Sequence, residues 1–439
     1  MNKITVIKNS LTDCIKNMSV EKERFVRNPL KDFIRNSKCN IETTTRIILG
    51  FEDQCLNSEL KNYYRNNLSN LPYKSTFVQQ RDKFSDYAFL NLFSDFNFKH
   101  PFKQTKYGLH LLAVDGSDLN LPTLFSDNEY FVENHTKNGK GFYQLHLNAL
   151  YDILEDRFVD VVTQPRPEFN EGLAMNLMVD RADYSPNSAL YIGDRNYFAL
   201  NVLAHITNAN QYYLIRCKNI ESKSSSLHNL NFPDSKEFDV HKDIKIIRSS
   251  KKCYNSLPDE YKCISNNRAF DFIEPHDSNS IFRLNFRVVS IILPNGSCEY
   301  LITNLPEKKF PPEVLKILYK ERWKEESAFH KLKYKCGLNW FHSIKRKFII
   351  QEIYAKIIMY NFSSLLAKAV DLKKVQSLKH HHTISFANVS KLARMFLNTN
   401  IAAKLIKTLI LMESPPVRTD RIAPRNVRSQ RVNPLNTRV

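Results

Sequence analysis

The sequence predicts an α/β fold built on a mixed β-sheet, and three observations support this class. From residue 109 onward, apolar runs of strand length are separated by turns or helical stretches. Three such runs come first, a helix follows, and strands and helices then alternate, which is typical of an α/β layout. Only 9 of the 439 residues are Gly, which argues against a glycine-rich dinucleotide fold and against an all-β protein with many turns.

The elements of this α/β region follow in chain order from the apolar runs and the turn residues between them. The expected strands cover residues 109–114, 144–151, 157–162, 189–192 and 212–217. The expected helices cover residues 171–182 and 197–206. Together they form the larger part of the predicted mixed sheet.

The charge balance points to a polyanionic partner. Lys and Arg number 64 and Asp and Glu number 45, so the formal net charge is 64 − 45 = +19. Apolar residues make up 42% of the chain, enough for the cores of two or three domains at about 150 residues each. Neither a G-x-G-x-x-G fingerprint nor a Walker loop occurs.

Residues 1–100 are expected to form a domain of short helices. Ser75 or Thr76 is expected to cap a helix over residues 77–84. Either a reader of DNA ends, related to the helix-turn-helix, or a plain helical cap fits this domain, and the sequence leaves both open. The polar residues of that helix are Gln79, Gln80, Arg81 and Lys83.

The rest of the chain is expected to contain a β-rich insertion and further helices. Expected strands of the insertion, residues 218–305, cover 244–247, 269–273, 282–292 and 298–301. Helices are expected from Pro311 onward, over residues 347–368 and 386–412. The predicted domains are 1–100 (helical), 101–217 and 306–370 (two parts of the core), 218–305 (insertion), 371–416 (C-terminal helices) and 417–439 (tail).

The tail, residues 417–439, contains six Arg and one Asp and is expected to be unfolded in isolation. Its arginines suit non-specific contacts with a nucleic-acid backbone, and an ordinary solvated tail is the alternative. The arginines concerned are Arg418, Arg421, Arg425, Arg428 and Arg431.

The cysteines and the N-terminus indicate a cytoplasmic protein without a membrane span. No two of the eight cysteines have the C-x2-C spacing of a zinc-binding pair. We therefore expect reduced, mostly buried thiols rather than a zinc site or a disulfide framework. The first 14 residues lack the apolar region of a leader, and no apolar run approaches about 18 residues.

The most informative segment is residues 317–335, ILYKERWKEESAFHKLKYK, which is expected to form one helix. At about 100° per residue, four polar side chains fall within an arc of about 60°. A solvated face of ion pairs would explain such a pattern equally well. The four residues are Tyr319, Arg322, Glu326 and Lys333.

The other side of this helix is expected to pack against the core. Glu321 and Glu325 fall inside the packing stripe, where the sequence offers them no partner. This geometry selects Glu326 among the three acids. The apolar members of the stripe are Leu318, Ala328, Phe329 and Leu332.

The spacing Tyr319-x2-Arg322-x3-Glu326-x6-Lys333 resembles the Y-x2-R-x3-E-x6-K signature of DDE-type bacterial insertion-sequence transposases, the family called insertion sequence four. The segments LAVDGS at residues 112–117 and YIGDRNY at 191–197 resemble its first-Asp and second-Asp motifs. The similarity spans roughly residues 75–370 and implies a ribonuclease-H-like core. The chain departs from the family pattern at Asn196, where Gly is common, and at Glu325, where an aliphatic residue is common.

The chemistry implied by the resemblance needs a cluster of carboxylates. Phosphodiester cleavage by in-line displacement is served by two divalent ions about 3.5–4 Å apart, and Mg²⁺ prefers oxygen ligands. Asp115, Asp194 and Glu326 are therefore the expected catalytic residues and metal ligands; whether Mn²⁺ substitutes is left open. We expect Asp115 and Asp194 at or near strand ends, and Asp118 in the turn beyond the first strand.

Each aspartate also has a purely structural interpretation. Asp115 could form a turn with Gly116, and Asp194 could cap a helix before Tyr197. The conjunction with the helix motif favours the functional interpretation of both residues.

The resemblance also implies a DNA-binding surface. Tyr319, Arg322 and Lys333 would hold phosphates of the transposon-end strand beside the carboxylates. Trp323 would stack on a displaced base or lie in the core, and Arg195 would contact phosphate or pair with Asp194; both alternatives stay open. His380, His381 and His382 are expected to form a polar loop rather than a metal site.

The sequence therefore predicts a cut-and-paste transposase that acts on double-stranded DNA, at transposon ends and at the target. A homodimer is expected in the synaptic complex, and the expected location is the bacterial cytoplasm at the nucleoid. Two alternatives remain: a DNA-binding descendant without catalysis, and a metal-dependent nuclease without strand transfer.

Overall fold

The computed structural model describes residues 2–417 except 36, 126, 134–140, 221, 223–224, 249–256, 258, 294–295 and 371–381. A ten-stranded mixed sheet forms its centre, with the strand order β2-β3-β1-β5-β6-β10-β9-β7-β8 and β4 paired with β3. The strands are β1 (His110–Asn120), β2 (Phe131–Val132), β3 (Phe142–Asp152), β4 (Arg157–Pro165), β5 (Ala189–Gly193), β6 (Tyr212–Cys217), β7 (Phe238–Ile247), β8 (Tyr261–Cys263), β9 (Phe282–Ile292) and β10 (Cys298–Thr303).

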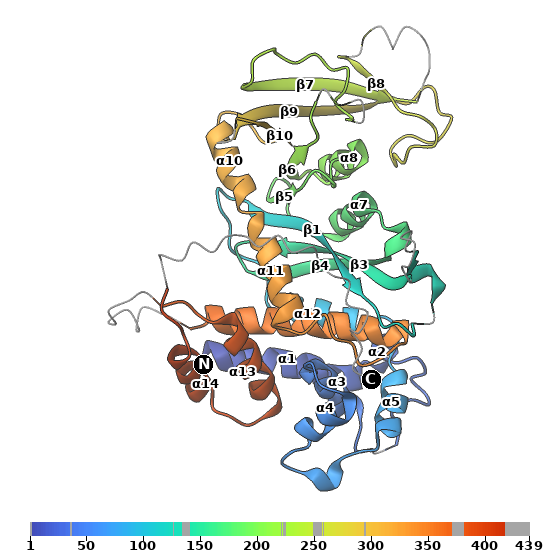
Figure 1. The fold of residues 1–439 in the computed structure, drawn as a ribbon, viewed down its shortest axis with the longest axis vertical. Helices are drawn as coiled ribbons and strands as arrows, with labels where there is room; N and C mark the ends of the chain where they lie inside the picture. The colour runs from blue at the N-terminus through green and yellow to red at the C-terminus, as the bar shows by residue number, and fades with distance from the viewer. Residues whose placement is uncertain are drawn as a thin grey trace.

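The helices form layers on both sides of this sheet (Figure 1). They are α1 (Lys3–Val20), α2 (Lys22–Phe25), α3 (Ile41–Gly50), α4 (Leu56–Tyr63), α5 (Lys74–Asp82), α6 (Ala88–Lys99), α7 (Glu171–Arg181), α8 (Leu200–Asn208), α10 (Pro312–Lys320), α11 (Trp323–Tyr334), α12 (Arg346–Lys368), α13 (Phe386–Asn398) and α14 (Ala403–Met412). Helices α7 and α8 pack on one face of the sheet, and α11 and α12 pack on the other.

The predicted mixed α/β class is confirmed, and the elements agree with the expected ones except at several boundaries. The strand expected at 109–114 continues to Asn120, and α8 begins at Leu200 rather than at 197. Residues 269–273 form a loop with a turn at 271–272 rather than a strand, and the helix expected over 386–412 is two helices. The strands within 218–305 extend the central sheet, because β10 pairs with β6. The division of the chain into domains stays a prediction.

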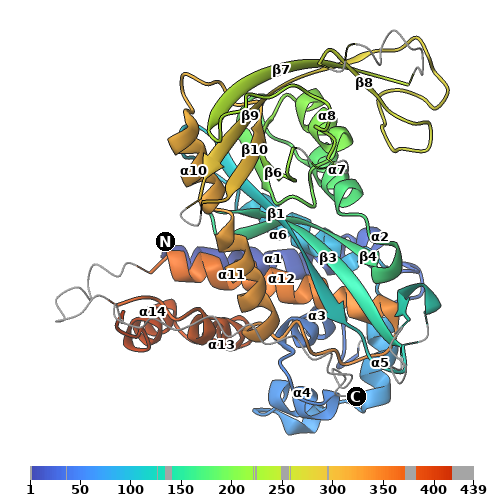
Figure 2. The same cartoon turned by 45° about the horizontal axis from the view of Figure 1, so that its top comes forward.

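Helix α12 is the centre of the helical layer below the sheet. It contacts α3, α6 and α13 as well as β4, so helices from both ends of the chain share one apolar core with the sheet (Figures 1 and 2). Seventeen of its 23 residues are buried, and most of these are apolar, as expected of a helix enclosed by the core.

A buried ion pair joins α5 to α12. The Arg81 guanidinium lies 2.9 Å from the Glu352 carboxylate, and both side chains are almost fully buried. Arg81 also donates to Gln351 and to the Phe348 carbonyl. Arg81 is therefore not available to read DNA, because its hydrogen-bonding groups face the protein interior. The helix also begins at Lys74 after Tyr73, not after Ser75 or Thr76.

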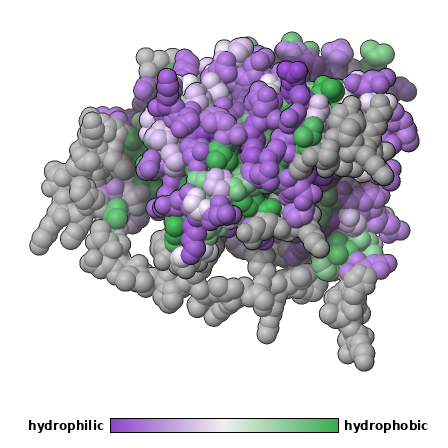
Figure 3. Space-filling model, turned by 90° about the horizontal axis from the view of Figure 1, so that it is seen from above, coloured by the Kyte–Doolittle hydropathy of each residue, from purple (hydrophilic) through white to green (hydrophobic). Residues whose placement is uncertain are grey.

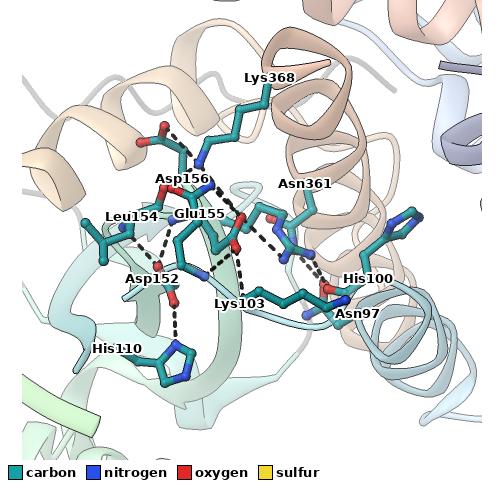
Figure 4. A network of polar contacts seen from close by, with 12 residues as sticks. Asn97, His100, Lys103, His110, Asp152, Leu154, Glu155, Asp156, Asn361 and Lys368 are labelled. Atoms are coloured by element: carbon teal, nitrogen blue, oxygen red, sulfur yellow. Dashed lines mark hydrogen bonds and ion pairs between the residues drawn. The ribbon is translucent and has the colours of Figure 1, made fainter. Parts of the chain in front are cut away.

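A polar network fixes the start of β1 against α12 (Figure 4). Glu155, in the turn between β3 and β4, accepts hydrogen bonds of 3.0 Å from the backbone N–H groups of Lys103 and Gln104. On α12, Asn361 donates to Asn97 at the end of α6. Lys368 at the end of α12 also lies 3.9 Å from the Glu155 carboxylate, so the turn, the segment before β1 and α12 are held together.

The face of the molecule nearest to β7–β9 is mostly hydrophilic, with smaller hydrophobic patches (Figure 3). Among the helices described, none combines the length and the apolar character that a bilayer span requires. Within the described ranges no two cysteines are joined by a disulfide, and four of the seven cysteines there are buried.

Candidate active site

The two predicted aspartates lie side by side on neighbouring parallel strands. The register of β1 and β5 ends with Val114 opposite Gly193. Asp115 follows Val114 and Asp194 follows Gly193 along the chain. Adjacent strands of a sheet are about 4.8 Å apart. The sheet therefore brings together two acids that are far apart in the sequence.

Side-chain alternation decides which face of the sheet each acid occupies. Ala113 of β1 and Ile192 of β5 belong to the core that α11 and α12 cover, so Asp115 and Asp194, two residues further on, point to the same side. Asp118 is an odd number of residues from Asp115 and points to the opposite face.

The prediction that Asp115 lies at or near the end of its strand is wrong, because Asp115 is in the middle of β1. Beyond Asp115, β1 loses its partner β5 but stays paired with β3 as far as Asn120. Asp115 therefore lies inside a strand, where its Oδ1 accepts a hydrogen bond of 2.9 Å from the Gly116 N–H. This excludes the turn interpretation of Asp115. Asp118, expected in a turn, is also inside β1.

Asp194 lies directly after β5, as expected. Its Oδ1 accepts a hydrogen bond of 2.8 Å from the Asn196 N–H. The following helix begins only at Leu200, after Ala199. The helix-cap interpretation of Asp194 is therefore wrong.

Helices α10 and α11 supply the third acid. The single helix expected over 317–335 is interrupted at Glu321 and Arg322, although both residues keep helical backbone angles. Arg322 Nη2 donates to Glu326 Oε1 at 2.9 Å, the i, i+4 pair that the helical spacing predicts. The predicted packing stripe is confirmed, since all four of its apolar residues are buried.

The two other acids of this segment differ sharply. Glu321 pairs with Lys324 at 2.8 Å and with Lys106 at 3.2 Å, so it lies outside the packing stripe. Glu325 is fully buried, as the stripe predicts, and neither of its carboxyl oxygens has a hydrogen-bond partner among the described residues.

The charges of the other two predicted acids act on Asp115. The pKa of Asp115 is raised from 3.8 to about 6, mainly by burial and further by the negative charges of Asp194 and Glu326. The Gly116 N–H and the Arg322 guanidinium lower it in part. The environment of Asp115 therefore favours its protonated form or a nearby cation.

The lysine of the motif connects α11 to β1. Lys333 Nζ donates to the backbone carbonyl of Asp118 at 2.7 Å, and burial lowers the pKa of Lys333. Tyr319 is buried, and burial raises its pKa to about 12. In this structure both side chains help to position α10 and α11 rather than face solvent.

A second polar cluster, which sequence reasoning missed, lies across the sheet from Asp115. His146 contacts the carboxylates of Asp118 at 2.6 Å and Glu171 at 3.3 Å, and Arg166 contacts Asp118 at 2.9 Å. Burial lowers the pKa of His146, but the two carboxylates raise it more, to a net increase. The alternation Gln-Leu-His-Leu-Asn at 144–148 was the available signal for polar side chains on one face of β3.

Basic side chains surround a cavity next to Asp194. The cavity has a volume of about 420 Å³ and is lined by Arg195, Arg216, Lys218 and Glu299, among others. Arg216 pairs with Glu299 at 3.2 Å, whereas Arg195 is exposed and forms no ion pair with Asp194 in the described chain. Trp323 is 54% exposed, which excludes its interpretation as a core side chain.

Several predicted residues cannot be placed. Arg418, Arg421, Arg425, Arg428 and Arg431, together with His380 and His381, lie outside the described residues. His382 Nδ1 contacts the Ser414 carbonyl at 2.7 Å.

The donor chemistry of the site fits a hard divalent cation. In the described part of the chain, no three His, Cys, Asp or Glu side chains are already arranged as a metal site, and Glu326 is held by Arg322. The predicted ligands Asp115, Asp194 and Glu326 nevertheless offer only carboxylate oxygens as donors. Carboxylate oxygens are the ligands that Mg²⁺ and Mn²⁺ prefer.

The mixed α/β fold and the two neighbouring aspartates agree with the class of protein that the motifs predict. The sequence profile described as "Transposase DDE domain" matches residues 106–362, more than half of the chain. The protein therefore belongs to this transposase family, which confirms the resemblance drawn from the motifs; membership of the insertion-sequence-four group stays a prediction.

No curated protein sequence matches the chain. The cryo-EM structure of the piggyBac transposase synaptic complex with hairpin DNA is 8% identical, with a TM-score of 0.46, over 93% of this chain and 84% of that one.

Proposed function

We propose that the protein is a cut-and-paste transposase that cleaves DNA at the inverted-repeat ends of an insertion sequence and joins the ends to a target. The observation that supports this most is the register of β1 and β5, which sets Asp115 beside Asp194 under the helix that carries Glu326. The core is proposed to be ribonuclease-H-like.

The proposed catalytic and metal-binding residues are Asp115, Asp194 and Glu326. Bound divalent ions, Mg²⁺ by this proposal, would supply activation of the attacking oxygen and stabilisation of the leaving oxygen. Two hydrogen bonds orient these carboxylates. The backbone N–H of Gly116 donates to Asp115, and the Arg322 guanidinium donates to Glu326. Release of Glu326 from Arg322 would free that guanidinium for a DNA phosphate.

The proposed DNA contacts follow from exposure and charge. Trp323 and Arg195 are exposed near the carboxylates and can meet a base and a phosphate. Arg322, and by the family resemblance Tyr319 and Lys333, belong to the same surface once DNA is bound. A homodimer, needed to bring two ends together, and a location at the bacterial nucleoid are parts of the same proposal.

The test is cleavage of the DNA that flanks the gene. The purified chain is incubated with labelled ends, with and without Mg²⁺, and the products are resolved on a denaturing gel. Asp115→Asn, Asp194→Asn and Glu326→Gln should each abolish nicking but retain end binding, while Glu321→Gln, a matched change on the same segment, should cleave like wild type. Wild-type cleavage by any of the first three would refute the assignment of that residue.

The same gel separates the alternatives. End binding without nicking in Mg²⁺ would favour a non-catalytic descendant. Cleaved ends that never join a target would favour a nuclease.

A further inference from the structure

Helix α11 carries a row of exposed side chains, three of which are aromatic. The row consists of Trp323, Ser327, His330 and Tyr334, spaced i, i+4, i+7 and i+11. At about 100° per residue these positions fall within an arc of about 60°. Trp323 is 54% exposed and Tyr334 is 57% exposed, and Ser327 and His330 are exposed as well. Rings gathered on one exposed face are typical of an interaction site. We call these four residues the aromatic row.

Two rings of the aromatic row contact each other. The ring centroids of His330 and Tyr334 lie 4.8 Å apart, with an angle of 46° between the ring planes. Both residues are exposed, whereas Ala328, Phe329 and Leu332 on the other side of the helix are buried. The contact limits the rotamers of both side chains before anything binds, which reduces the entropy that a partner would have to remove.

Charged side chains flank the aromatic row on both sides. About 70–90° to one side lie Glu326 and Lys333, which belong to the proposed catalytic face. About 70–110° to the other side lie three lysines, Lys324, Lys331 and Lys335. The aromatic row therefore lies between the carboxylate of α11 and a line of positive charge.

This arrangement fits a single strand of DNA. Aromatic rings stack on bases, and lysines beside them attract the phosphates of the strand. In a duplex the base faces are stacked on one another, so they cannot meet side chains on a helix surface. The aromatic row rises about 11 × 1.5 Å, roughly 16 Å, which is the length of about five nucleotides stacked at roughly 3.4 Å each. The formal net charge of +19 also favours a polyanion.

We propose that the aromatic row binds a single DNA strand that has separated from its complement beside the carboxylates. Bases stack on Trp323, His330 and Tyr334, and the phosphates lie along the three lysines. This inference rests on the proposed action on DNA ends and extends it. Base stacking at Trp323 alone holds one nucleotide next to Glu326, whereas His330 and Tyr334 continue the path along α11, away from that carboxylate.

The test is DNA binding by the full-length protein in EDTA, measured by fluorescence anisotropy with the flanking DNA as a labelled single strand and as a labelled duplex. His330→Ala and Tyr334→Ala should each weaken single-strand binding about 5- to 150-fold, the range of one base–ring contact, and leave duplex binding nearly unchanged. Tyr334→Phe keeps the ring and should bind the single strand like wild type. Ser327→Ala, the same truncation at the position of the row without a ring, should also bind like wild type.

Thermal unfolding serves as the control for folding. All of these side chains are exposed, so the variants should unfold at nearly the wild-type temperature. Single-strand binding that stays at the wild-type level in both alanine variants would overturn the inference. Equal losses for single strand and duplex, or equal losses in Tyr334→Ala and Tyr334→Phe, would overturn it too.

The cleavage gel separates this inference from the proposed function. If wild type nicks DNA in Mg²⁺ while both alanine variants bind the single strand normally, the role of the aromatic row is refuted and the transposase stands. If wild type never nicks but the alanine variants lose single-strand binding, the proposed function is refuted and the aromatic row stands as a site for single-stranded DNA.

Discussion

Replacing Asp115 with Asn should stabilise the metal-free protein at neutral pH while abolishing its activity. Burial, and the charges of Asp194 and Glu326, raise the pKa of Asp115 from 3.8 to about 6 in the folded state. Because the folded state binds this proton more tightly than the unfolded state, the contribution of Asp115 to stability falls as the pH rises from about 4 to 6. Above that window the ionised carboxylate is a constant penalty.

The size of the effect follows from the shift. At 1.36 kcal/mol per pKa unit, a rise from 3.8 to about 6 costs about 3 kcal/mol at pH 7. The penalty falls to about 1 kcal/mol at pH 4.5, where the folded-state carboxyl is mostly protonated. Asn keeps the shape and can still accept the hydrogen bond of the Gly116 N–H.

The assay is urea unfolding in EDTA at pH 7 and at pH 4.5, followed by tryptophan fluorescence. Asp115→Asn should unfold at higher urea than wild type at pH 7, with a gain of about 3 kcal/mol that shrinks toward about 1 kcal/mol at the lower pH. Glu321→Gln is the control, because its ion pair with Lys324 lowers the pKa of Glu321 and its neutralisation should not stabilise the fold. A loss of stability in Asp115→Asn at pH 7, or an equal gain at both pH values, would refute the electrostatic argument.

Three further predictions concern Glu352, Gly116 and Trp323. Glu352→Gln removes the counter-charge of the buried Arg81 and should cost about 3–5 kcal/mol of unfolding free energy, measured in urea; a loss below 1 kcal/mol would contradict it. Gly116→Ala places a Cβ 2.4 Å from His146 Nε2, so the unfolding midpoint should fall by the equivalent of about 1–3 kcal/mol, and unchanged stability would speak against the packing described. Trp323→Ala should weaken binding to single-stranded or distorted ends by about 1–3 kcal/mol in fluorescence anisotropy, with thermal stability nearly unchanged because the indole is 54% exposed; equal affinity would exclude base stacking.

Much of the fold was predictable because local patterns specify it. Strand β6, for example, has the bounds expected from its apolar run, and β9 likewise. The errors lie where tertiary pairing overrides local signals. Little in the mostly polar run from Asp115 to Asn120 indicates a strand, and the ladder to β3 holds it extended.

By itself, the sequence determined which acids to consider and how α11 is oriented, because spacing along a helix defines its faces. It also marked Glu325 as an acid on a core-facing side. Only the tertiary structure decided that Asp115 and Asp194 are neighbours, that Asp118 lies on the opposite face, and that Arg81 is buried in an ion pair. These arrangements depend on strand register and on contacts between residues hundreds of positions apart. The local sequence around each residue contains no signal for such contacts.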